Sequence, residues 1–352
     1  MGKYRTGLEM LKSYSVEEKE WDVKLDANEN ANNLPPLVQE RLISRLSFLP
    51  FNRYPDSNML DLRTQIAQSL NLTIDNVLIG NGSSEILQSL CHAFGGAGRS
   101  IVFPNPSFSM YAIYAQLADS QPVSVSLEED FSLSRDKLLK TAEQVKASLV
   151  ILCNPNNPTG NVMPPEDIEY IVAHANCPVV VDEAYYEFYG QSAVRLLGQY
   201  SNLIVARTFS KAYGMAAARI GYMLAANEIT AMVGKVMMPY HVNALSLVAA
   251  EVICQMRDEF VLNIKQTLVE RNRLAVSLEC LPGVKVYPSE TNFLLIRINN
   301  ADALTKLMAD QGIAIRDFDS APGLTDCLRI TVGTPLENEA VLQVMKKWSE
   351  RR

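Results

Sequence analysis

The feature that most limits the fold of this chain is a series of short apolar runs, each followed by a helical pattern. The runs are rich in Val, Ile and Leu and lack the alternation of a half-exposed strand. Such runs are typical of strands that are buried on both faces of a mostly parallel sheet. The repeated order of strand and helix therefore predicts α/β architecture. The runs are VLIGNG (77–82), SIVFPNP (100–106), SLVILCNPNNPTG (148–160), PVVVDEAYYEF (178–188) and NLIVARTFS (202–210).

The last third of the chain has a different pattern, which predicts a smaller α+β domain. Residues 246–280 form one long helical pattern, and short strands and two helices follow it. A chain of 352 residues is long enough for one large and one small domain. We expect an N-terminal arm with part of the small domain at 1–47, a large domain at 48–245 and a small C-terminal domain at 246–352.

Composition and charge argue against several classes of partner. The net charge is −7 at pH 7, and no basic stretch favours nucleic acid. No apolar run has the length of a membrane span, and the first residues lack the apolar segment of a signal peptide, so we expect a cytoplasmic protein. The three histidines and six cysteines lack the spacing of metal ligands, which predicts no metal site. Small molecules are the expected ligands.

Polar residues follow the first strand in the turn GNGSSE, residues 80–85. Gly82, Ser83 and Ser84 at the start of a helix would direct N–H groups and hydroxyls at an anion. The positive end of the helix dipole would favour a phosphate there. The same residues also suit a plain helix cap, so both interpretations stay open.

Later strands end in residues with carboxylate, phenol and amide groups. In α/β sheets, ligands bind beyond the carboxyl ends of the strands, so these side chains are expected to meet there. Asp182 follows an apolar run, and a carboxylate at that depth needs a cation or a strong donor. Tyr185 offers a phenol nearby, and Asn157 in CNPNNPTG offers an uncharged amide. Asp182 could instead cap a helix or form a structural ion pair, and Asn157 could belong to a turn that is only structural.

The segment TFSKAYGMAAARIGY, residues 208–222, places a lysine just past a buried strand. Desolvation there would lower the pKa of Lys211 below its usual value of about 10.4 and make the amine fit for Schiff-base chemistry. Thr208, Ser210 and Arg219 would together hold a phosphate, and Arg219, among apolar neighbours, is expected to need a buried anion. The alternative for Lys211 is a surface lysine on a loop.

Taken together and in this order, the motifs resemble those of the fold-type I pyridoxal-phosphate-dependent aminotransferases, over nearly the whole chain. The resemblance implies an aspartate-aminotransferase-like large domain, with a mostly parallel sheet that binds pyridoxal 5′-phosphate, and a smaller α+β domain. Lys211 would hold this cofactor as a Schiff base and later move protons as the catalytic base. Asp182 would pair with the ring nitrogen, and Asn157 and Tyr185 would hydrogen-bond the ring's phenolic oxygen.

The same resemblance implies a phosphate site and a stacking residue. Phe108 would stack on the face of the cofactor ring, with a core aromatic as the alternative. The residues implied at the cofactor phosphate are Gly82, Ser83, Ser84, Thr208, Ser210 and Arg219.

Further segments resemble the histidinol-phosphate aminotransferases. They are LKSY (11–14), KLDANEN (24–30), NRYPD (52–56), MPYHVNALS (238–246), ETNFLLIR (290–297), GIAIRDF (312–318) and CLRITVGT (327–334). This resemblance implies that Arg329 binds the amino-acid carboxylate, while Arg316 and Tyr14 help to bind the substrate phosphate. Asn28 would also contact substrate. Tyr54 would reach the cofactor phosphate of a partner subunit, which implies a homodimer with shared active sites.

The reaction implied is the transfer of an amino group between glutamate and imidazole-acetol phosphate, which gives histidinol phosphate and 2-oxoglutarate in histidine biosynthesis. An aromatic amino acid aminotransferase or a phosphothreonine decarboxylase of the same fold would use nearly the same residues. Thr208-x-x-Lys211 also imitates the S-x-x-K motif of acyl-transferring hydrolases, but its partner motifs are lacking. A binding or regulatory protein without activity is the other alternative, and the presence of Lys211 and Asp182 argues against it.

Overall fold

The computed structural model describes residues 19–350 and contains a large sheet of seven strands. The strands are β2 (Val77–Gly80), β3 (Ser100–Asn105), β4 (Gln121–Ser126), β5 (Leu149–Cys153), β6 (Val179–Asp182), β7 (Leu203–Thr208) and β8 (Gly221–Ala225). They lie in the order β2-β8-β7-β6-β5-β3-β4. Six of the seven run in one direction and β8 runs against its neighbours, which confirms the mostly parallel sheet predicted from the apolar runs.

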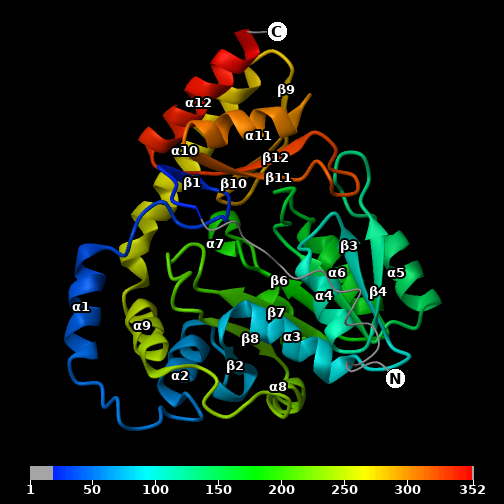
Figure 1. Ribbon diagram of the computed structural model, residues 1–352. Helices are drawn as coiled ribbons and strands as arrows, with labels where there is room; N and C mark the ends of the chain where they lie inside the picture. The colour runs from blue at the N-terminus through cyan, green and yellow to red at the C-terminus, as the bar shows by residue number, and fades with distance from the viewer. Residues whose placement is uncertain (1–18, 351–352) are drawn as a thin grey trace, which may run out of the picture.

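Helices cover both faces of this sheet (Figure 1). They are α2 (Leu60–Ser69), α3 (Gly82–Phe94), α4 (Met110–Leu117), α5 (Arg135–Gln144), α6 (Pro165–His174), α8 (Asn227–Gly234) and α9 (Ala244–Gln255). In β6, Val179 and Val181 belong to a core shared with α2, α5, α6 and α9. Val180 belongs to the core on the opposite face, with α3, α4 and α8. Burial on both faces explains the continuous apolar runs in the sequence.

The apolar runs did not predict β4 and β8. β4 lies at the edge of the sheet, and only Val125 of its six residues is buried, so its sequence lacks a continuous apolar run. β8 is fully buried, but it directly follows the turn around Arg219, which the sequence analysis interpreted only as a ligand-binding segment.

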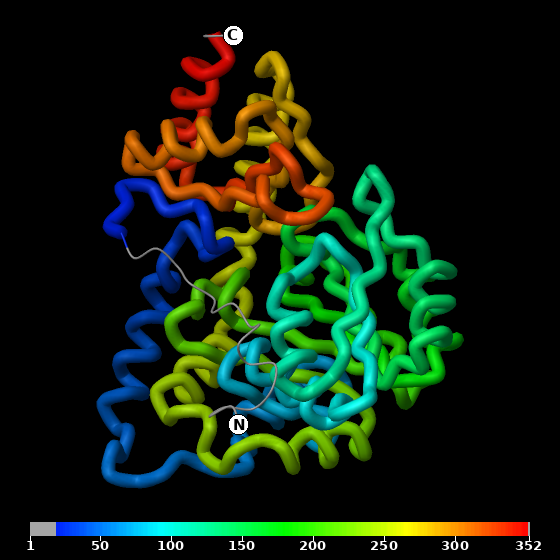
Figure 2. Tube along the Cα trace, turned by 45° about the vertical axis from the view of Figure 1, so that its right-hand side comes forward, coloured from blue at the N-terminus to red at the C-terminus, as the bar shows by residue number. Residues whose placement is uncertain are grey.

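A second sheet of five strands forms the smaller part of the molecule (Figure 2). Its strands are β1 (Val23–Leu25), β9 (Val284–Val286), β10 (Phe293–Ile298), β11 (Ile313–Asp317) and β12 (Cys327–Thr331), in the order β1-β11-β12-β10-β9. β1 comes from the N-terminal segment and pairs in parallel with β11, so that Val23 lies opposite Ile313. The segment after β1 is thereby brought from the small sheet towards the large one.

The long helical pattern from residue 246 is two helices in the structure. α9 ends at Gln255, and α10 (Val261–Glu279) begins after a 3-10 turn at Arg257–Phe260. The break lets α9 pack against α1 (Pro36–Leu46) and α2 beside the large sheet, while α10 packs with the small sheet and α12 (Pro335–Glu350). The guanidinium of Arg257 stabilises the turn by donating hydrogen bonds to Ser69 Oγ and Cys254 Sγ.

The two-part α/β architecture is the one predicted. The domain limits near residues 47 and 245 stay predictions. Within residues 19–350, no helix is long and apolar enough to cross a membrane.

Candidate active site

A cavity of about 510 Å³ lies where the carboxyl ends of β5, β6 and β7 face the small sheet. The segment after β1 completes its lining. The structure brings most of the predicted site residues together here. Those that line the cavity are Asn28, Ser83, Ser84, Phe108, Asn157, Asp182, Tyr185, Thr208, Ser210, Lys211, Arg219, Arg316 and Arg329.

Lys211 lies just after β7, and its Nζ donates a hydrogen bond to the carbonyl oxygen of Ala27 at 2.9 Å. Enclosure by the protein lowers the pKa of the Lys211 ammonium to about 8. The guanidinium groups of Arg329 and Arg219 act in the same direction. An amine with this pKa is partly uncharged near neutral pH, so it is suited to act as a nucleophile or a base.

Asp182 ends β6, and its carboxylate is almost completely buried. Tyr111 on α4 donates its hydroxyl proton to Oδ2 at 2.7 Å, whereas Oδ1 has no hydrogen-bond partner among residues 19–350. Burial raises the pKa of this carboxyl group to about 6, although Tyr111 and the backbone N–H of Ala184 oppose the shift. A buried carboxylate with one unpartnered oxygen beside a cavity favours a ligand that carries a cation or an N–H group.

Hydroxyl groups line the part of the cavity near α3 and the end of β7. Ser83 and Ser84 lie in the first turn of α3, and Thr208 is the last residue of β7. The Thr208 hydroxyl accepts a hydrogen bond from the backbone N–H of Ser210 at 3.1 Å, which orders the turn between them. Together with the N–H groups at the start of α3, these hydroxyls could hold a phosphate.

Arg219 differs from the prediction, because its side chain is exposed instead of buried. The guanidinium is open to the cavity and to solvent, so no buried anion is needed to compensate its charge. A Cβ atom at Gly82 would come within 2.8 Å of Arg219 Nη2. Glycine at this position, where φ is +78°, therefore allows the guanidinium to lie against the start of α3.

A chain of hydrogen bonds crosses the cavity between the two sheets. The phenolic oxygen of Tyr185 accepts hydrogen bonds from Nδ2 of Asn28 at 2.9 Å and from Nδ2 of Asn157 at 3.3 Å. Arg329 donates from Nη1 to Asn157 Oδ1 and from Nη2 to the carbonyl oxygen of Asp26, both at 2.6 Å. Burial raises the pKa of the Tyr185 phenol well above its usual range, so Tyr185 keeps its proton at neutral pH.

Arg316 and Arg329 lie directly opposite each other on β11 and β12. Arg329 is buried between the rings of Phe293 and Phe318, with centroid distances of 5.3 and 5.5 Å from its guanidinium carbon. Arg316 is only half buried, and its side chain makes no hydrogen bond or ion pair with other residues that the structure describes. Two guanidinium groups side by side could bind a carboxylate, a phosphate or both.

Phe108, Tyr54 and Tyr14 differ in their positions relative to the cavity. Phe108 lines the cavity, and its ring meets that of Tyr111 edge-on at 5.5 Å. Tyr54 does not line the cavity: it is 80% exposed and stacks on Tyr240 with the ring centroids 4.6 Å apart. Tyr14 lies outside the described residues.

The sequence interpretation missed two buried groups beneath the site. One is Tyr111, which nothing in its segment SFSMY distinguishes from a core aromatic. The other is an ion pair in which Arg207 Nε donates to Glu183 Oε2 at 2.9 Å, with the guanidinium over the ring of Tyr186 at 3.5 Å. An arginine inside the apolar run of β7, beside an acidic residue that follows β6, is a signal that could have predicted this pair.

The donor set of the cavity fits pyridoxal 5′-phosphate. The unpartnered Oδ1 of Asp182 suits a ring N–H, Lys211 supplies an amine of lowered pKa, and hydroxyls with Arg219 suit the phosphate. Among residues 19–350, no group of three or more His, Cys, Asp or Glu side chains could hold a metal ion.

Comparisons with known proteins agree with this chemistry. Residues 21–345 match the family model of the class I and II aminotransferases. A histidinol-phosphate aminotransferase of Caldanaerobacter subterraneus subsp. tengcongensis is 37% identical over 348 residues, which cover 97% of each chain.

Solved structures share the fold. A histidinol-phosphate aminotransferase from Sinorhizobium meliloti in complex with pyridoxal-5′-phosphate superposes with a TM-score of 0.90, at 24% identity, over 100% of this chain and 99% of that one. An L-threonine-O-3-phosphate decarboxylase from Porphyromonas gingivalis superposes with a TM-score of 0.82, at 26% identity, over 93% and 99% of the two chains. The chain therefore belongs to the class I and II aminotransferases, in the family of its histidinol-phosphate aminotransferase relatives.

Proposed function

We propose that this protein is a pyridoxal-phosphate-dependent aminotransferase that moves an amino group between glutamate and imidazole-acetol phosphate, giving histidinol phosphate and 2-oxoglutarate. The observation that carries the proposal is the meeting of Lys211, Asp182 and a phosphate-binding donor set in one cavity. The full-length relationship to histidinol-phosphate aminotransferases supports the choice of substrates. A biosynthetic role of this kind also supports a cytoplasmic location.

When bound, pyridoxal phosphate carries the amino group between the two substrates and accepts electrons from the substrate Cα into its ring. Asp182 would face the ring nitrogen through Oδ1 and, as a carboxylate, keep that nitrogen protonated. Lys211 would take the proton from the substrate Cα, since its pKa of about 8 leaves it partly uncharged near neutral pH. Tyr185 and Asn157 would hydrogen-bond the phenolic oxygen of the ring, and Phe108 would cover one of its faces.

The phosphate of the cofactor would lie between the start of α3 and the end of β7. The residues proposed for it are Gly82, Ser83, Ser84, Thr208, Ser210 and Arg219. For the substrates, Arg329 would bind the carboxylate of glutamate, and Arg316 would bind the phosphate of histidinol phosphate together with Tyr14. Arg316 has no competing ion pair among the described residues, which supports this role.

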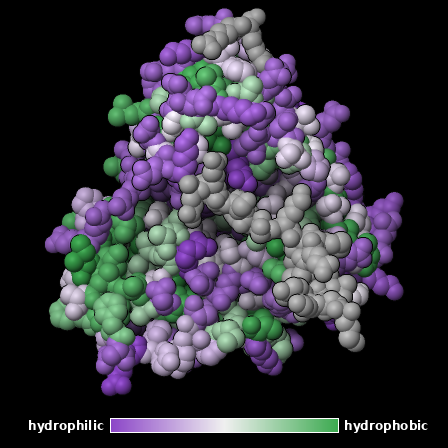
Figure 3. Space-filling model, viewed as in Figure 1, coloured by the Kyte–Doolittle hydropathy of each residue, from purple (hydrophilic) through white to green (hydrophobic). Residues whose placement is uncertain are grey.

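We also propose that two copies of the chain form a homodimer with shared active sites. Tyr54 would then contact the cofactor phosphate of the partner, which agrees with its exposure and its distance from the cavity of its own chain. Apolar side chains gather over α1 and its surroundings on the face shown in Figure 3. Exposed apolar residues of this region include Leu37, Ile43, Phe48, Phe51 and Leu245.

The proposal is tested by absorption spectra of the purified protein, recorded from the near ultraviolet to the visible before and after addition of histidinol phosphate. We expect a visible cofactor band that falls when the substrate is added. A Lys211→Ala variant should lose turnover by about 10²- to 10⁴-fold or more. Its absorption band should not fall as the wild-type band does when histidinol phosphate is added. An exposed lysine on α5, in the variant Lys140→Ala, provides the matched control and should behave as the wild type. A wild-type protein without a band after incubation with pyridoxal phosphate would rule the proposal out.

A second candidate is decarboxylation of a phosphorylated amino acid, because the fold is shared with the L-threonine-O-3-phosphate decarboxylase. Turnover with histidinol phosphate, phenylalanine and phosphothreonine separates the candidates. Release of CO₂ from phosphothreonine without transamination of histidinol phosphate would favour the decarboxylase.

A further inference from the structure

The phenol of Tyr185 is held by two amide groups on the edge of the cavity. Nδ2 of Asn28 and Nδ2 of Asn157 both donate hydrogen bonds to its oxygen, at 2.9 and 3.3 Å. The ring itself is buried and meets Phe293 edge-on at 5.2 Å. A phenol has one proton to donate, and Tyr185 donates it to no residue that the structure describes.

The orientation of the Asn157 amide is fixed by Arg329. A guanidinium can only donate hydrogen bonds, so the Asn157 atom that lies 2.6 Å from Nη1 must be the oxygen. The nitrogen of the same amide then faces Tyr185.

The Asn28 amide is fixed by a second, independent chain of hydrogen bonds. The backbone N–H of Asn28 can only donate, and it donates to Thr331 Oγ1 at 3.0 Å. The Thr331 hydroxyl therefore directs its proton elsewhere, to Asn28 Oδ1 at 3.3 Å. With its oxygen engaged by Thr331, the Asn28 side chain presents its NH₂ group to Tyr185.

We infer that Asn28 and Thr331 are positioning residues that, with Asn157, force the Tyr185 O–H to point into the cavity as a hydrogen-bond donor. Two N–H groups occupy the acceptor positions of the phenolic oxygen, so the remaining direction is the open one. This inference rests on the proposed function, because the acceptor that it places there is the phenolic oxygen of the cofactor. It gives Asn28 a role that does not require contact with the substrate.

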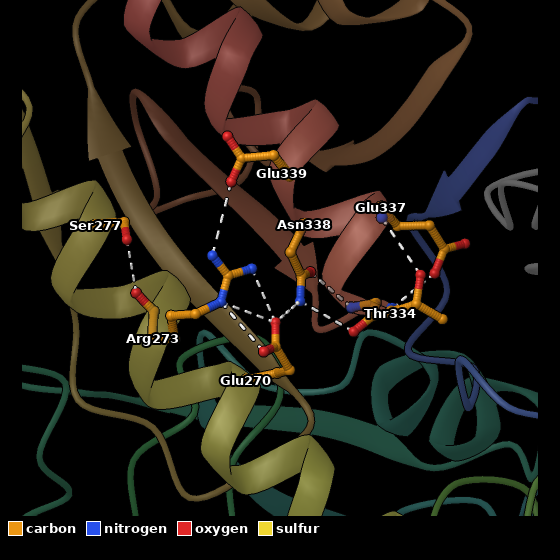
Figure 4. Close-up of polar contacts among 8 residues, drawn as sticks. Glu270, Arg273, Ser277, Thr334, Glu337, Asn338 and Glu339 are labelled. Atoms are coloured by element: carbon orange, nitrogen blue, oxygen red, sulfur yellow. Dashed lines mark hydrogen bonds and ion pairs between the residues drawn. The ribbon is translucent and has the colours of Figure 1, made fainter.

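The surroundings hold both positioning residues in place. Asn28 has a φ of +53°, a conformation that asparagine tolerates better than most residues, and its carbonyl oxygen accepts a hydrogen bond from Asn292 Nδ2 at 3.1 Å. Thr331 ends β12, and the chain just after it is anchored by the buried Asn338, which bonds both the N–H and the C=O of Gly333. Figure 4 shows how Asn338 also reaches Glu270 on α10, at 2.9 Å.

The variant Asn28→Asp tests the inference, because a carboxylate of the same shape accepts hydrogen bonds and cannot donate one. The Tyr185 proton would then turn towards residue 28, and the cofactor oxygen would have one donor fewer. That oxygen would keep more negative charge, so Nζ of Lys211, where it is joined to the cofactor, would hold its proton more tightly. In a pH titration of the visible absorption band, we expect the midpoint to rise by about one to two pH units. Thr331→Val, which frees the amide without adding charge, should raise it by less.

A double variant separates positioning from other effects of the new charge. The titratable and charged groups facing Tyr185 are Arg329, Asp182 and Cys153, and these variants leave them unchanged. If Asn28 acts through Tyr185, then Asn28→Asp should shift the midpoint little further once Tyr185→Phe is present. Asn33→Asp, the same chemical change at an exposed position of the same segment, is the matched control and should have no effect.

The outcomes are distinct. An unchanged midpoint in both Asn28→Asp and Thr331→Val, with a changed KM for histidinol phosphate, would overturn the inference and make Asn28 a substrate contact. An equal shift with and without the Tyr185 hydroxyl would overturn it as well, in favour of direct electrostatics. A wild-type protein that takes up no cofactor would defeat the proposed function itself, and the inference with it.

Discussion

The two sides of the cavity use charge in different ways. The floor, formed by Asp182, Glu183 and Arg207 at the ends of β6 and β7, is buried, with an ion pair between neighbouring strands and a hydrogen bond from Tyr111 on α4. The wall is formed by Arg316 and Arg329 on β11 and β12, and Arg329 donates hydrogen bonds to Asn157 and Asp26, which are distant from it in the sequence. We therefore expect substitutions in the floor to lower the stability of the fold and substitutions in the wall to act mainly on substrate binding and catalysis.

The largest stability effect is expected for Arg207→Met, which removes the ion pair with Glu183 in the floor. Glu183 would remain buried with its charge, and only the hydroxyl of Ser192 and the backbone N–H of Ala193 would still donate to it. Loss of one partner of a buried pair should lower the free energy of unfolding by about 3–5 kcal/mol. Denaturant unfolding of the variant and the wild type measures this difference.

The matched control is Arg273→Met on α10, which removes an ion pair with Glu270 that is partly exposed (Figure 4). We expect a loss of about 0–1 kcal/mol there. Equal losses of unfolding free energy in Arg207→Met and Arg273→Met would mean that the buried pair in the floor stabilises the fold no more than a surface ion pair does.

A second prediction concerns the pH dependence of stability at Asp182. The pKa of its carboxyl group is raised from 3.8 to about 6 in the folded protein, so the folded state binds this proton more tightly than the unfolded state. Its contribution to stability is therefore fully present below about pH 4 and is lost as the pH rises through about 6. The cofactor-free Asp182→Asn protein should be more stable than the cofactor-free wild type above about pH 6, by on the order of 2–3 kcal/mol.

Unfolding of both cofactor-free proteins at several pH values checks this prediction, and the difference should vanish below about pH 4. An Asp182→Asn protein that is less stable than the wild type at neutral pH would show that the hydrogen bonds from Tyr111 and the Ala184 N–H stabilise the carboxylate by more than its burial costs.

The smallest stability effects are expected in the wall, where the changes should appear in catalysis instead. Arg329→Lys keeps the charge but loses the fork that reaches both Asn157 and Asp26, so kcat/KM should fall by about 10- to 100-fold. Arg316→Lys has no such contacts among the described residues to lose, and kcat/KM should fall by less than about 10-fold. Steady-state kinetics with histidinol phosphate and with glutamate measures both.

A stability loss of about 3 kcal/mol or more in Arg329→Lys would erase the distinction between floor and wall. A larger catalytic effect for Arg316→Lys than for Arg329→Lys would reverse the proposed importance of the two arginines.

The sequence predicted Asp182 in the floor, but it did not predict the Glu183–Arg207 pair beside it. Asp182 and Lys211 could be identified because each directly follows an apolar run, and parallel strands bring their carboxyl ends to one edge of the sheet. β4 could not be identified from its pattern, since most of its residues are accessible and its apolar residues are few. Arg219 was predicted to be buried but is exposed. Apolar neighbours in the sequence do not show whether the side chain in a turn is accessible to solvent.

The contacts that orient the site residues could not be predicted from the sequence, for a different reason. Tyr111 meets Asp182 across the packing of α4 on the sheet, and Asn28 meets Thr331 only after β1 joins β11. Neither contact has a local signal, because each depends on how segments far apart in the chain are placed by the fold. The resemblance to known aminotransferases supplied roles for residues such as Arg329, but not their partners.

The arginines of the cavity have a consequence for how substrates arrive. Arg219, Arg316 and Arg329 carry permanent positive charge in a chain whose net charge is −7. An anionic metabolite that diffuses towards the protein is repelled on average by its surface and attracted at this opening. Encounters of anionic metabolites with this opening should therefore become slower as the ionic strength rises, whereas encounters with the rest of the surface should become more frequent.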